Sequence, residues 1–281
     1  MTLDTILTSL VYLAVAFLLF FIGKVIFQLF HPKINMKHEL VEADNAAFAL
    51  ALTGYYTGLL LAIGSAIVGP SRGLVQDMID IGLYGLLAIL LLNLAAIFND
   101  KVLLRHFNIR KELIADRNAG TGAVEAANYI ATGLIVFGAV VGEGGGWLTA
   151  IIIWVAGQLI LLLTSFVYNL IVPYSIHKQI EKDNVAVGIG YAGAIISIGN
   201  LVRHGAQYDF TGWYDMAYNI GIETGIGLAF LPLVRFATDR ILLSGRSMTD
   251  ELVHQDKPNV GVVLLEGFAY VGGSVLITYC L

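Results

Sequence analysis

"HELVEADNAA", residues 38–47, lies between two apolar segments and recurs three more times along the chain. The other copies read "KELIADRNAG" from Lys111, "KQIEKDNVAV" from Lys178 and "DELVHQDKPNVG" from Asp250. Each copy has a carboxylate or amide, an apolar pair, an acidic cluster, and then Asn before small or apolar residues. The chain is therefore expected to repeat one structural unit, and the place of this motif in the unit decides the fold.

Composition places the chain in a membrane. Of its 281 residues 57% are hydrophobic and only 13% are charged, and the mean hydropathy is +0.78. This is more apolar side chain than a soluble fold of this size covers. Runs of about 20 apolar residues are long enough to cross the hydrocarbon core as helices. The sequence predicts an all-α membrane protein with eight such helices, at residues 6–30, 46–68, 79–98, 119–142, 147–173, 185–202, 213–236 and 260–280.

Basic residues gather on one side of these predicted helices. The connections after the second, fourth and sixth helices hold only Arg72 and Arg203. The positive-inside rule therefore places the motif side in the cytoplasm and both termini outside. The other connections hold Lys33, Lys37, Lys101, Arg105, Arg110, Lys111, Arg117, Lys178, Lys182, Arg235, Arg240, Arg246 and Lys257.

The motif asparagines, Asn45, Asn118, Asn184 and Asn259, are 73, 66 and 75 residues apart, which is one helical hairpin with its loops. Because a hairpin crosses the membrane twice, successive copies share one orientation and form a parallel repeat. Each Asn is expected to cap the helix that follows it. Docking of a partner and coordination of an ion are the alternative roles for the motif.

A longer period also runs through the chain. Glu125 and Glu266 lie seven residues after the Asn in the second and fourth copies, where the other copies have Leu52 and Tyr191. The sequence thus predicts two tandem four-helix units, residues 1–143 and 144–281.

The segments "HELVEADNAAFALALTG" and "KQIEKDNVAVGIGYAG" resemble the signature of the domain-of-unknown-function 350 family of bacterial inner-membrane proteins. Typical members have four helices and two such motifs, so the resemblance implies a double-length version. It implies topology and a location in the bacterial inner membrane, but no activity. Two copies depart from the pattern, since the third begins with Gln179 and the fourth has Pro258 before its Asn.

Three carboxylates stand out well inside the predicted spans, away from their ends, where a charge costs at least ~2.5 kcal/mol. Glu125, Glu266 and Glu223 are therefore candidates for a cation or proton path, or for a carboxylate pair around one cation at the repeat interface. Protonated carboxyls that bond neighbouring helices are the structural alternative. Lys24 is the one basic residue expected at comparable depth, so ion pairing is not expected. The polar neighbours expected along the path are Asn128, Tyr191, Asn200, Asn219 and Tyr270.

Small residues recur at spacings that let helix backbones approach closely. These are Gly54, Gly58, Gly188, Gly190, Gly193, Gly221 and Gly225.

No signature of a protease, hydrolase or nucleotide-binding loop is present. A single cysteine, Cys280, excludes an intrachain disulfide and a cysteine metal site. We expect no enzyme activity, no metal, no cofactor and no nucleic-acid partner.

Two functions remain open at the level of sequence. The first is a channel or transporter-like protein that moves a small cation or protons through the membrane Glu residues. The second is a membrane sensor or scaffold whose cytoplasmic hairpin tips dock a soluble partner, in a setting such as envelope stress. Either function allows a homo-oligomer in the lipid bilayer.

Overall fold

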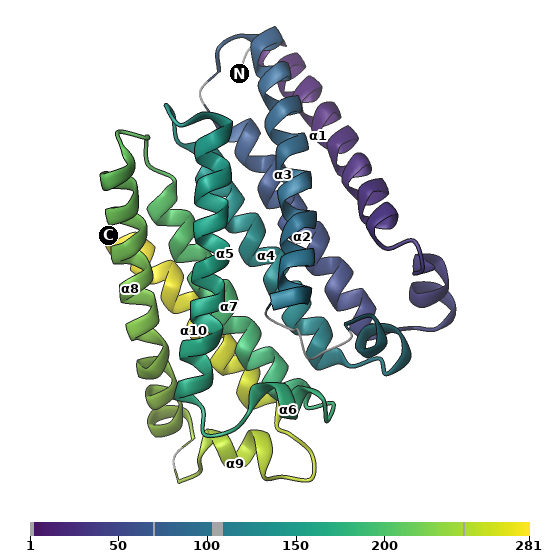
Figure 1. Ribbon diagram of the computed structural model, residues 1–281, viewed down its shortest axis with the longest axis vertical. Helices are drawn as coiled ribbons and strands as arrows, with labels where there is room; N and C mark the ends of the chain where they lie inside the picture. Colours follow the sequence, from purple (N-terminus) through teal and green to yellow (C-terminus); the bar gives the residue numbers. More distant parts are fainter. Residues whose placement is uncertain (1–2, 70, 103–108, 244) are drawn as a thin grey trace.

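The computed structural model describes residues 3–69, 71–102, 109–243 and 245–281, and all regular structure in these ranges is helical (Figure 1). Eight helices are long and apolar enough to cross a membrane, which confirms the predicted spans and makes this a multi-pass membrane protein. Arg105, part of the charge count, lies outside the described residues. The eight are α1 Leu3–Phe30, α2 Ala46–Val68, α3 Leu74–Val102, α4 Ala119–Val141, α5 Gly146–Ile171, α7 Val185–Ala206, α8 Trp213–Ala237 and α10 Val260–Cys280.

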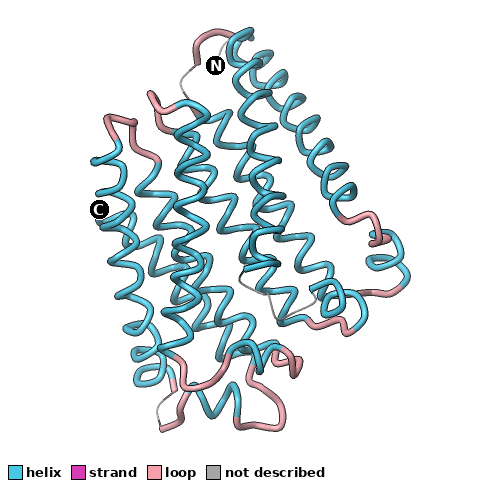
Figure 2. Tube along the Cα trace, viewed as in Figure 1, coloured by secondary structure: helices cyan, strands magenta, loops and turns pink. Residues whose placement is uncertain are grey.

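The eight helices form two rows of four. The helices that follow the motif, α2, α4, α7 and α10, form one row in which each helix packs against the next. The other four, α1, α3, α5 and α8, form a second row that covers it (Figure 1). The connections lie at the two ends of the bundle, and all four motif segments share one end (Figure 2). We call this the motif end. Four parallel hairpins, grouped as two four-helix halves, are therefore confirmed.

Glycines bring the helices of the motif row into backbone contact. A Cβ on Gly58 would lie 2.2 Å from the Tyr129 carbonyl oxygen, and a Cβ on Gly188 would lie 2.5 Å from the Gly120 carbonyl oxygen. The predicted close approach is therefore confirmed in the motif row. It is wrong for Gly221 and Gly225 on α8, where an added Cβ would meet open space.

The motif segments at the motif end are short helical turns followed by a sharp reversal. They are the π-helical turns His38–Glu42 and Lys111–Ala115, and the α-helices α6 Ile176–Ile180 and α9 Met248–Val253. In the first three copies the residue before the Asn has a positive φ, at 47°, 52° and 59°. Proline cannot adopt such a φ. The fourth copy, with Pro258, therefore makes the reversal over a longer connection.

Candidate functional site

Each motif asparagine is the N-cap of its helix. The Asn45 side chain accepts a hydrogen bond from the Phe48 N–H at 3.1 Å, and its amide donates to the Glu39 carboxylate at 2.8 Å. Asn118, Asn184 and Asn259 accept the same bond from Thr121, Val187 and Val262, and donate to Glu112, Gln179 and Glu251. The leading carboxylate or amide of the motif thus orients the cap.

The same asparagines also join one repeat to the next. The Asn45 amide donates to the Leu113 carbonyl at 2.8 Å, and Leu113 follows the leading Glu of the second copy. Asn118 donates to the Ile180 carbonyl at 2.6 Å, and Asn184 donates to the Leu252 carbonyl at 2.7 Å. The Asn118 bond therefore connects the two halves, and the motif explains both helix starts and the order of the row.

Glu266 on α10 forms a buried ion pair. Its Oε1 accepts from the Arg235 guanidinium of α8 at 2.8 Å, and both side chains are inaccessible to solvent or nearly so. The expectation that no basic residue except Lys24 reaches this depth is wrong, because the last turn of α8 carries the buried side chain of Arg235. The Glu266 Oε2 atom makes no hydrogen bond with a described residue.

Tyrosines surround this pair. The Tyr270 hydroxyl donates to Glu266 Oε1 at 3.4 Å, and the Tyr168 ring lies 6.0 Å from the Tyr270 ring. Tyr174 follows α5, and the charge of the Arg235 guanidinium acts on its phenol. Burial raises the pKa of Tyr174 to about 12, so its phenol is neutral at pH 7.

Glu223 on α8 is held in a similar way nearer the opposite end of the bundle. Its Oε1 lies 2.5 Å from His204 Nδ1, and both side chains are buried. The Glu223 Oε2 atom makes no hydrogen bond within the described part of the chain. Both carboxylates in the second half therefore have one oxygen held by a basic side chain and one oxygen without a partner there.

Two of the expected polar neighbours lie between these carboxylates. The Asn200 amide donates to the Ser274 hydroxyl at 3.2 Å, which joins α7 to α10. Its oxygen accepts from Arg203 at 3.1 Å. Tyr270 contacts Glu266, as described above. Ser274 follows Tyr270 by four residues and His204 follows Asn200 by four, so each pair shares one helix face.

The other three expected neighbours lie elsewhere. Asn128 is buried on α4, and its Oδ1 has no hydrogen-bond partner among the described residues. The Tyr191 hydroxyl is hydrogen-bonded to Ser165 on α5. Asn219 is half-buried next to the backbone of Gly205. Within the described residues, no hydrogen bond joins any of these three side chains to Glu266 or Glu223, and sequence position alone did not show this.

Glu125 on α4 is buried in different surroundings. It lines a cavity of about 360 Å³ with Tyr129, and His31, Lys33 and Arg110 line the same cavity. Burial lowers the pKa of His31. Because α7 packs between α4 and α10, Glu125 and Glu266 face different neighbours. The expected pair of carboxylates around one cation is therefore not formed.

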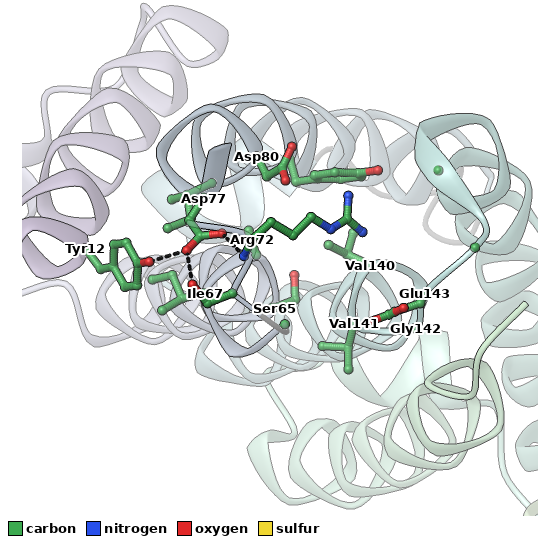
Figure 3. Close-up of a pocket in the computed structure, with 17 residues that line it drawn as sticks. Tyr12, Ser65, Ile67, Arg72, Asp77, Asp80, Val140, Val141, Gly142 and Glu143 are labelled. Atoms are coloured by element: carbon green, nitrogen blue, oxygen red, sulfur yellow. Dashed lines mark hydrogen bonds between the residues drawn. The ribbon is translucent and has the colours of Figure 1, made fainter. Parts of the chain in front are cut away.

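A second cavity, of about 300 Å³, lies at the opposite end of the bundle (Figure 3). Asp77 accepts hydrogen bonds there from the Tyr12 hydroxyl, from the Ser71 hydroxyl at 2.5 Å and from the Arg72 N–H at 2.7 Å. The Arg72 guanidinium extends away from Asp77 (Figure 3). Sequence reasoning missed Asp77, although an acidic residue in the first turn of a helix is a recognised signal for the helix start. Its bonds fix the α2–α3 turn against α1.

The sequence also gave weak signals for Arg235 and His204. Arg235 stands near the end of its predicted helix and was counted with a connection, and His204 lies two residues beyond the predicted helix 185–202. Extending the predicted helix 185–202 by two residues would have placed His204 one turn after Asn200, on the same helix face.

The comparisons place the chain in a family. The family model described as Domain of Unknown Function (DUF350) matches residues 1–140 and again residues 144–281. No curated protein and no solved structure matches the chain. The two matched segments coincide with the two four-helix halves of the fold. This chain therefore belongs to the DUF350 family and carries two copies of its domain in tandem.

Proposed function

We propose that this protein conducts protons across the bacterial inner membrane and that its second half provides the path. In this proposal the motif end is cytoplasmic and both termini are outside, in keeping with the distribution of Lys and Arg. The observation that carries the proposal is the line of buried polar groups between α7, α8 and α10. Intramembrane ionisable residues that face a bundle interior are common in proton relays.

The line begins at Glu266, which is six residues into α10 from its motif end. Tyr270 and Ser274 follow on the same helix face, and each step of four residues is a rise of about 6 Å. Ser274 bonds Asn200 on α7, and His204 lies one turn further along α7. His204 contacts Glu223, so titratable groups stand near both ends of the line.

The charges beside the carboxylates favour protons over metal cations. Arg235 holds Glu266, and His204 holds Glu223, each within hydrogen-bond distance. A positive guanidinium this close repels a second cation in a medium of low dielectric constant. A proton needs only the oxygen of each carboxylate that has no partner, and it leaves the other oxygen bonded. Glu266 and Glu223 are thus the groups that take up and release the proton.

Docking of a soluble partner at the motif end stays a prediction. The motif asparagines are buried, or half-buried at Asn259, and their amide groups bond within the chain. A partner would therefore have to recognise other side chains of the hairpin tips.

The experiment is proton flux into proteoliposomes that contain a trapped pH-sensitive dye, driven by a potassium diffusion potential. Wild-type protein should acidify the lumen faster than empty liposomes. Glu266→Gln and Glu223→Gln, which keep shape but cannot ionise, should each lower the rate at least about tenfold. Glu266→Asp, which can still ionise, should retain measurable flux.

The matched control is Asp80→Asn, a change of carboxylate to amide in the first half that lies outside the line. It should leave the rate within about twofold, and thermal unfolding of each variant reports the fold. Wild-type flux no greater than that of empty liposomes would end the proposal. Equal flux in wild type and in the Glu266→Gln, Glu223→Gln double variant would also end it.

A further inference from the structure

A basic cavity of about 650 Å³ lies beside α1 and α2 at the motif end of the first half. Lys24, Lys33 and Lys37 line it, and no carboxylate does. Within the described residues none of the three lysines forms an ion pair. Three exposed lysines without an ion-pair partner among the described residues make this cavity attractive to an anion.

The depth of the lysines matches the headgroup level of a bilayer. Lys24 lies six residues before the end of α1 at Phe30, which is about 9 Å along the helix. A lysine at this depth extends its ammonium toward the interface while its stem stays in apolar surroundings. Lys33 and Lys37 follow in the connection beyond the helix end, so all three lysines lie near the interface.

The rest of the lining suits a lipid rather than a free ion. Leu40, Val41, Leu52 and Tyr56 contribute to the wall, and the Val41 side chain is 72% exposed. Pro32, Lys33 and Ile34 also line the neighbouring 360 Å³ cavity, whose other walls include Phe27 and Phe48. The basic cavity therefore borders a second cavity whose wall includes these two aromatic rings, at the level where acyl chains begin.

We propose that this cavity binds the phosphate headgroup of an anionic phospholipid in the leaflet at the motif end. Basic pockets between transmembrane helices are suited to such headgroups because each Lys near the surface adds an attraction to the anionic lipid. The three lysines bind the phosphate, and the apolar wall holds the first part of an acyl chain.

The second half has neutral side chains at the positions of two of these lysines. The two halves can be aligned on Pro32 and Pro173. In this alignment Ser165 takes the position of Lys24, and Tyr174 takes the position of Lys33. Ser165 is hydrogen-bonded to Tyr191, which occupies the place of Leu52. Tyr174 is half-buried near the Arg235 guanidinium. Neutral hydroxyl groups thus replace two of the lysines, and the site belongs to the first half.

Native mass spectrometry of the detergent-solubilised full chain tests the proposal. The probes are phosphatidylglycerol, phosphatidylcholine with the same acyl chains, and inorganic phosphate. The test variant is Lys24→Gln, Lys33→Gln, Lys37→Gln. The control is Lys178→Gln, Lys182→Gln, Lys257→Gln, which removes the same charge from the motif end outside this cavity.

Wild type and control should retain phosphatidylglycerol about tenfold better than phosphatidylcholine, and the test variant should lose this preference. Thermal unfolding of the three proteins should be alike, since the lysines make no ion pair to lose. Equal retention by test and control variants would overturn the site. Displacement of phosphatidylglycerol by millimolar inorganic phosphate would show that a free anion suffices, and would overturn the lipid assignment.

Discussion

The two halves share one scaffold but differ at the buried glutamate of each. In the second half Glu266 is enclosed by Arg235 and tyrosines. In the first half Glu125 lines a cavity whose wall includes Arg110 and Lys33. The positive charge is inside the helix bundle in one half and in the exposed motif connection in the other.

Matched positions explain the difference. Arg235 and Ala96 each lie sixteen residues before the leading Glu of a motif, so the first half has a methyl group where the second half has a guanidinium. Thr249 and Arg110 each lie two residues before that Glu, and the Arg235 guanidinium bonds the Thr249 hydroxyl at 3.3 Å. Duplication thus kept the caps and the helix row, while the side chains around each glutamate diverged to give one closed and one open site.

Removing the internal countercharge should have the largest effect. Arg235→Leu leaves the buried Glu266 carboxylate without its partner and should destabilise the protein by about 3–5 kcal/mol. Arg110→Leu, at an exposed position of the first half, should change stability by less than about 1 kcal/mol. Thermal unfolding in detergent measures both. The double variant Arg235→Leu, Glu266→Leu should recover most of the loss, and equal melting of single and double variants would contradict the ion-pair account.

Blocking the glycine contacts should affect the two halves alike, because the row is common to both. Gly58→Ala in α2 and Gly193→Ala in α7 each place a Cβ within 2.6 Å of neighbouring backbone atoms. Each should cost about 1–3 kcal/mol by overpacking. Gly225→Ala, at an open position of α8, is the control and should be neutral or slightly stabilising. A large loss of stability for only one of the two variants would show that the helix contacts in the motif row are not equivalent in the two halves.

The asparagine caps should give smaller losses that depend on the link between repeats. Asn118→Ala loses the cap and the bond to the Ile180 carbonyl of the second half, for about 2 kcal/mol in all. Asn259→Ala loses a cap but no bond to a following repeat, and should cost about 1 kcal/mol. Chemical unfolding of both variants measures the difference. Equal losses of stability in the two variants would mean that the hydrogen bond from Asn118 to the next repeat adds no stability.

Much of the fold could be predicted from sequence because it depends on local signals. The apolar runs gave the eight spans, and the recurring Asn gave the caps and the parallel hairpins. Both signals act within one helix or one turn, so no knowledge of distant contacts was needed.

The surroundings of the carboxylates depend on contacts between helices, and these could not be derived in the same way. Arg235 is 31 residues from Glu266 along the chain, and its role depends on how α8 packs against α10. The basic cavity was missed for a related reason. In the sequence Lys33 and Lys37 contribute to a general charge bias and Lys24 lies inside a predicted helix, and only the fold brings the three to one cavity. Gly221 and Gly225 show the converse, since their spacing permitted a helix contact that does not occur within the chain.

The most direct test of the account compares proton flux in proteoliposomes of Glu266→Gln and Glu125→Gln, the matched substitutions in the two halves. The account places the proton path in the second half, so Glu266→Gln should lower the rate at least about tenfold while Glu125→Gln keeps it within about twofold of wild type. Thermal unfolding recorded alongside shows whether each variant is folded. Loss of flux in folded Glu125→Gln with normal flux in Glu266→Gln would contradict the account and move the path to the first half.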